Sequence, residues 1–204
     1  MTVPMALVDL IPVILFFMAA MTLLHDLYHM MSKGAFALLA AGLIVISCAG
    51  FYKALWKLLY AMNICDFAVL NTCFFPMQST GFLIGGLGMV SLLCFRQKST
   101  AYAAAVPAVY SGTMLFVFFT VLGTAGIWGS LAAIAAKMKK KNIMFLFLIS
   151  FVCMLGMGYL STKDFADPKL NWIAEAVNII GMALFFTGVR SLHQAGLETF
   201  QLNH

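Results

Sequence analysis

Long, nearly unbroken runs of apolar residues fill the chain, and short polar turns separate them. A helix needs about 20 apolar residues to cross the hydrocarbon core of a bilayer. Because the apolar positions are continuous rather than alternating, they predict membrane-spanning helices and not the strands of a barrel. Five of the predicted spans are well bounded by polar residues or by proline; they cover about residues 5–25, 35–60, 76–95, 142–160 and 171–190.

The stretch from Thr100 to Lys137 is too long for one crossing. As a single helix rising 1.5 Å per residue it would be more than about 50 Å long, against a hydrocarbon core of about 30 Å. The segment Gly123-Thr124-Ala125-Gly126 gives the best signal for a break. We therefore predict two spans here, at about 101–122 and 125–140. This makes seven spans in total, and a single crossing, giving six, is the alternative.

Composition supports the same fold class, since 63% of the residues are hydrophobic and only 9% are charged. A soluble domain carries about 25% charged residues, so bilayer is the expected solvent for most of this chain. The sequence predicts an all-α, polytopic transmembrane bundle with very short loops, in which residues 1–204 form one integral membrane domain. The basic residues that give the net charge of +5 lie at the ends of apolar runs, where they act as topology signals. This placement excludes nucleic acid as a partner.

The basic residues also predict an orientation, because cytoplasmic loops of membrane proteins are enriched in Lys and Arg. Seven spans with the N-terminus outside leave Lys53, Lys57, Lys163 and Lys169 outside. The inside then holds Lys33, Arg96, Lys98, Lys137, Lys139, Lys140, Lys141 and Arg190. Six spans with the N-terminus inside give a weaker bias. We expect a cytoplasmic (inner or plasma) membrane location with the C-terminus inside. We also expect the first helix to be retained, since no Lys or Arg precedes its apolar run, which carries Asp9 instead.

The last predicted span carries a polar stripe of Asn171, Glu175 and Asn178, whose i, i+4, i+7 spacing places them on one helix face. A carboxylate in a span is costly, so it normally faces the bundle interior or a partner. One interpretation is a binding or translocation site. The alternative is a structural hydrogen-bonding stripe near the interface, because Glu175 is only about one turn from the predicted helix start.

Lys53 and Lys57 share one face near the end of the second predicted span. They are typical of lysines that snorkel to the headgroups, and this is the alternative to a role in a site. With seven spans they lie in the same leaflet as Asp9 and Glu175, so we expect one of these acids to neutralise a lysine. Asn171, Glu175, Asn178, Lys53 and Lys57 are accordingly our candidate site for a small solute or ion in a transporter or channel.

The sequence His25-Asp26-Leu27-Tyr28-His29 matches H-E-x-x-H in spacing only. Two histidines at i, i+4 can share a metal, with His193 as the third ligand that a catalytic site needs. A b-type haem would need His193 as well. A polar helix end among headgroups is the alternative. No cofactor is predicted outright, and a metal or haem at His25, His29 and His193 is the weaker hypothesis.

Other functions stay open. Gly81 and Gly85 form a GxxxG pair, which suits close packing within the chain or a homodimer face. No glycine-rich phosphate loop, nucleophile elbow or catalytic carboxylate pair occurs, so we do not expect an enzyme. The chief alternative to transport is a non-catalytic sensor or an assembly subunit that binds a partner membrane protein. A metal-dependent membrane enzyme is the weaker alternative.

Overall fold

The computed structural model describes residues 3–94, 113–160 and 168–200, and within them the chain is helical apart from short turns. Helices α1 (Val3–Val8) and α2 (Leu10–Leu27) meet at Asp9, and a 3₁₀ turn, η1 (Leu197–Thr199), follows the last helix. The other helices are α3 (Lys33–Ala61), α4 (Ala68–Thr72), α5 (Phe74–Cys94), α6 (Thr113–Lys137), α7 (Lys141–Leu160) and α8 (Pro168–Gln194). The described part contains 6 helical segments long and apolar enough to cross a membrane, so the all-α transmembrane class is confirmed.

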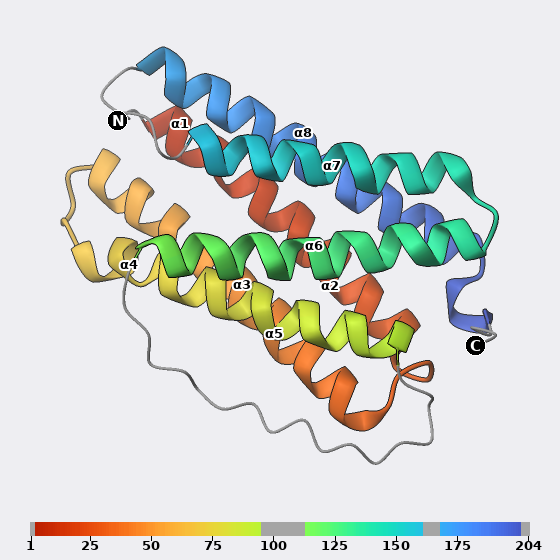
Figure 1. Cartoon of the computed structure of the whole chain (residues 1–204). Coiled ribbons are helices and arrows are strands. Elements are labelled where there is room, and N and C mark those ends of the chain that lie inside the picture. The colour runs from red at the N-terminus through yellow and green to blue at the C-terminus, as the bar shows by residue number, and fades with distance from the viewer. Residues whose placement is uncertain (1–2, 95–112, 161–167, 201–204) are drawn as a thin grey trace.

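The long helices close into a ring (Figure 1). Around it, α2 packs on α3, α3 on α5, α5 on α6, α6 on α7, α7 on α8, and α8 back on α2. Ser32 caps the start of α3 by accepting a hydrogen bond from the amide of Ala35 at 3.3 Å, which ends the short turn after α2. Each long helix therefore packs along its length on two others in the ring, and the outer faces remain apolar, as lipid contact requires.

Aromatic side chains fill the centre of the ring. Trp128 stacks on Phe185 with ring centroids 4.3 Å apart, and Phe185 stacks on Phe16 at 5.9 Å. The indole of Trp128 donates to Ser150 at 2.8 Å, and the Ser150 hydroxyl donates to the carbonyl of Gly181 at 2.7 Å. These two hydrogen bonds join α6, α7 and α8 and satisfy the polar atoms of Trp128 and Ser150 in the aromatic core.

Glycines set the close spacing of α3, α5 and α6. A Cβ on Gly42 of α3 would overlap the backbone of Gly85 in α5, and a Cβ on Gly123 of α6 would overlap the backbone of Phe82. Gly86 and Gly126 continue the second contact, since a Cβ on Gly126 would lie 2.9 Å from the Cα of Gly86. Small residues at such crossings let transmembrane helices approach closely.

The predicted break at Gly123–Gly126 is therefore wrong. α6 runs without interruption from Thr113 to Lys137, and its glycines serve contact with α5 rather than a turn. The predicted spans 101–122 and 125–140 are replaced, within the described residues, by this one helix; the part of the first that falls in 95–112 lies outside them. The six-span alternative thus matches the count of described helices.

The other span boundaries are close to prediction, with one shift. α8 begins at Pro168, before the predicted start of the last span at about residue 171. Proline suits a first helical turn, because the amide hydrogen that it lacks would have no partner there. Residues 161–167 lie outside the described part.

α5 and α6 run in the same direction, because Phe82 lies beside Gly123 and Gly86 beside Gly126. Cys94 and Thr113 consequently lie at opposite ends of the bundle (Figure 1).

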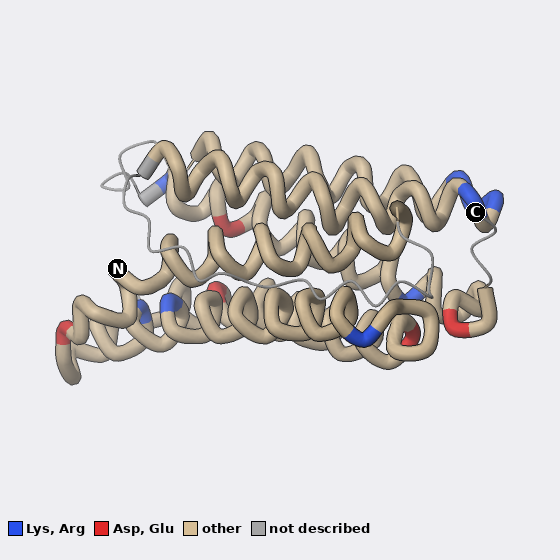
Figure 2. Tube along the Cα trace, turned by 60° about the horizontal axis from the view of Figure 1, so that its bottom comes forward, with Lys and Arg blue, Asp and Glu red and all other residues tan. Residues whose placement is uncertain are grey.

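Charged residues gather toward the two ends of the helices, as Figure 2 shows. We call the end where α2 begins and α3 finishes the Asp9 end, and the opposite one the Asp26 end. Among the described residues, the Asp9 end carries Lys53, Lys57 and Lys169. The Asp26 end carries Lys33, Lys137, Lys139, Lys140, Lys141 and Arg190. The bundle is therefore more basic at the Asp26 end.

Candidate functional sites

Four charged side chains converge at the Asp9 end, and we call them the charged cluster: Asp9, Lys53, Lys57 and Glu175. Asp9 stands at the joint between α1 and α2 with helical backbone angles, and its amide donates to the Met5 carbonyl at 3.1 Å. The two lysines lie one turn apart on α3, and Glu175 lies in the second turn of α8. Three spans that are distant in sequence thus contribute to one place.

The strongest contact in the charged cluster is the ion pair between Lys57 Nζ and Asp9 Oδ2, at 2.6 Å. Both side chains are largely buried, being 17% and 11% exposed. Glu175 interacts electrostatically with Asp9 and with both lysines. The expectation that an acid at this end neutralises a lysine is confirmed for Asp9 and Lys57.

Glu175 is only 5% exposed, and its Oε1 has no hydrogen-bond partner among the described residues. An ionised carboxylate in so dry a place is costly unless each oxygen is satisfied. Lys53 is stabilised differently. Its Nζ lies 4.0 Å from the ring centroid of Phe74, and the face of the aromatic ring attracts the cation. Neither lysine reaches away from the bundle as a freely snorkelling side chain would.

Asn171 and Asn178 lie on the same face of α8 as Glu175, one turn before it and about one turn after it. Both are half-buried, so they flank the charged cluster along the helix without being enclosed by it. Their predicted part in ligand binding stays a prediction.

A second group, the histidine cluster, lies at the other end and comprises His25, Asp26 and His193. The Nδ1 atoms of His193 and His25 lie 2.8 Å and 3.3 Å from the same oxygen, Asp26 Oδ1. Asp26 is fully buried, whereas both imidazoles are partly exposed. Of the predicted set of His25, His29 and His193, the structure thus brings two together around an aspartate, whereas His29 lies outside this cluster.

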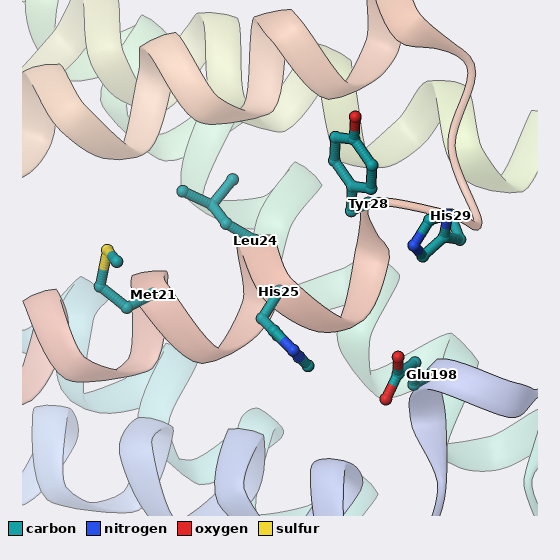
Figure 3. Close-up of a pocket in the computed structure, with 6 residues that line it drawn as sticks. All are labelled: Met21, Leu24, His25, Tyr28, His29 and Glu198. Atoms are coloured by element: carbon teal, nitrogen blue, oxygen red, sulfur yellow. The ribbon is translucent and has the colours of Figure 1, made fainter.

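An open cavity of about 340 Å³ adjoins the histidine cluster (Figure 3). His25, Tyr28 and His29 line it from the end of α2, and Glu198 lines it from η1. Gly196 adopts a left-handed φ of 84°, which turns the chain after α8 and places the fully buried Leu197 against α2. That turn brings Glu198 beside the histidines.

Sequence reasoning missed Asp26 as a potential ligand. In the H-D-x-x-H pattern, Asp26 occupies the position of the catalytic base of a zincin rather than that of a ligand. Only the packing of α8 on α2 shows that Asp26 lies between two imidazoles. The sequence contains one indication of this contact. The spacing from Asp9 to Asp26 in the first span is similar to the spacing from Glu175 to His193 in the last span. Two parallel helices with matched polar residues near both ends indicate contacts at both ends.

No protein-family model matches this chain, and no curated protein or solved structure does either. The functional argument therefore depends on the two clusters themselves.

Proposed function

We propose that this protein is a small transporter or channel for a small solute or ion, and that the charged cluster around Glu175 is its binding site. The observation that carries the proposal is a buried carboxylate with an unpaired oxygen beside two lysines and a second acid, inside the membrane-spanning part of the bundle. Ionisable groups within spans are expensive and normally mark pathways or binding sites.

Holding these helices together requires fewer charged groups than the cluster contains. One ion pair, Asp9 with Lys57, already links α2 to α3. Adding Lys53 and Glu175 brings two more groups that must lose water, and replacing buried ion pairs with apolar side chains is often neutral or stabilising. The surplus of charge fits a site that exchanges its partner with a ligand.

The arrangement also favours a ligand class. Both lysines lie close enough to Glu175 to interact with it electrostatically. Because ammonium groups attract anions, a small anion is the ligand class that we propose for the cluster.

The test is solute uptake by the purified protein in liposomes, with and without a pH gradient. The panel comprises chloride, nitrate, phosphate, acetate and lactate, with sodium and potassium as cations. We expect uptake of at least one anion, and a loss of at least tenfold in Glu175→Gln, which keeps the shape of the side chain but removes its charge and its exchangeable proton.

The matched control is Asp66→Asn, since Asp66 is exposed at the same end, where it accepts a hydrogen bond from Trp56 at 2.9 Å. This variant should transport like the parent. If the parent moves none of the panel, or if Glu175→Gln moves every solute as well as the parent, the proposal fails.

A further inference from the structure

We propose that His25, Asp26 and His193 form a binding site for a divalent transition metal such as Zn²⁺, separate from the charged cluster. The site lies at the Asp26 end, where α2 and α8 finish. Asp26 is 17 residues beyond Asp9 on the same helical span, which is about 26 Å at 1.5 Å per residue. The two sites are therefore on opposite sides of the apolar core.

The geometry fits a small, nitrogen- and oxygen-bound ion. One ligand atom from each of the three residues lies within 4.8 Å of the others. In a tetrahedral site with bonds of about 2.1 Å, neighbouring ligand atoms are about 3.4 Å apart. The distances of 2.8 Å and 3.3 Å from the imidazoles to Asp26 Oδ1 are close to that spacing, so side-chain rotations alone can admit the ion.

The buried carboxylate supplies an independent argument. Asp26 is 0% exposed, and its Oδ2 has no hydrogen-bond partner among the described residues. A buried carboxylate oxygen without a partner is costly, and a metal ion is one of the few groups that can satisfy it there. The two histidines add neutral ligands, which is the donor set that Zn²⁺ prefers.

The surroundings leave room for a further ligand. Glu198 lines the adjoining cavity together with His25 and His29. Its carboxylate adds negative charge beside the cluster, which favours a cation at this end of the bundle. Because His25 and His193 are partly exposed, ions reach the cluster from the aqueous side at this end of the bundle.

The test is Zn²⁺ binding to the full chain, purified in mild detergent through a tag without histidines and stripped of metal. Calorimetry and elemental analysis give affinity and stoichiometry, and Co²⁺ provides the visible spectrum of a four-coordinate nitrogen and oxygen site. We expect about one Zn²⁺ per chain and a rise in the temperature of unfolding with added metal. Asp26→Asn and His193→Gln should each weaken binding by more than about tenfold.

Glu175→Gln, a substitution at the buried carboxylate of the other end, should bind Zn²⁺ like the parent, so this test and the transport test can fail separately. His193→Gln guards against misfolding of Asp26→Asn, because the His193 side chain is about half exposed. The site assignment is overturned if the parent binds no Zn²⁺ at micromolar concentration. It is equally overturned if both site variants keep the parent's affinity and Co²⁺ spectrum.

Discussion

At the scale of single residues, the first span carries two buried acids, one near each of its ends. Asp9 and Asp26 stand near the two ends of α2, and both are nearly or fully buried. Each contacts a group from another helix: Lys57 of α3 in one case and His193 of α8 in the other. Buried acids of this kind are either paired or bound to metal, so each one fixes a local arrangement of helices.

The ion pair of Asp9 and Lys57 should contribute measurably to stability when only one partner is removed. Asp9→Asn leaves the lysine without its counter-ion in a largely buried position. We expect a loss of about 3 kcal/mol in the free energy of unfolding, measured by denaturant titration in micelles. The double variant Asp9→Asn with Lys57→Met removes both charges and should recover most of that loss. A single variant as stable as the parent would show that the pair is solvated.

Residue patterns predicted one cluster better than the other. Helical spacing and the order of the spans place Lys53, Lys57, Asp9 and Glu175 at one end, and the structure joins them there. Asp26 required more, because its two contacts depend on the rotation and register of α8. The matched polar spacing on the two helices indicates which ends meet, but it does not fix the rotation that places Asp26 between two imidazoles. His25 and His193 were paired by counting histidines, not by predicting their geometry.

At the scale of helices, glycine is the residue whose meaning the sequence leaves ambiguous. In a soluble chain Gly123 and Gly126 indicate a break. In this bundle they form the surface of α6 that contacts Gly86 and Phe82 of α5. Gly81 and Gly85 of the GxxxG pair are likewise buried against α3 within the chain. A homodimer through these two glycines stays an untested prediction.

Two glycines of α6 allow a matched test of this interpretation. Gly123→Ala places a Cβ against the backbone of Phe82, which cannot rotate away, so α5 and α6 must separate. We expect a loss of about 3 kcal/mol in the free energy of unfolding, at the upper end for overpacking. Gly129→Ala, on the same helix with nothing within 4 Å of its Cβ position, should be neutral or slightly stabilising. Equal effects in the two variants would contradict the packing role of Gly123.

At the scale of the whole molecule, hydropathy predicted the class and most span boundaries but not the unbroken course of α6 from Thr113 to Lys137. Apolar length fixes where a helix can lie in a membrane, and it does not say whether a long apolar stretch bends or crosses once. The packed centre of the ring also sets a condition on the proposed transport. Phe16, Trp128 and Phe185 fill the space between the two clusters, so a ligand passes only when these rings move apart.

Orientation in the membrane is the last property that the bundle predicts. The Asp26 end is richer in basic residues, so the positive-inside rule places it in the cytoplasm and the Asp9 end outside. Two positions report on this: Cys65, which is exposed in the turn between α3 and α4, and Lys140, which is exposed between α6 and α7. One variant keeps Cys65 as the single cysteine, and the other carries Lys140→Cys on a cysteine-free background. A membrane-impermeant thiol reagent should label Cys65 on intact cells and the Lys140→Cys variant only after permeabilisation. Reversed labelling would place the charged cluster on the cytoplasmic side, and labelling of both from one side would contradict the placement of Cys65 and Lys140 at opposite ends of the bundle.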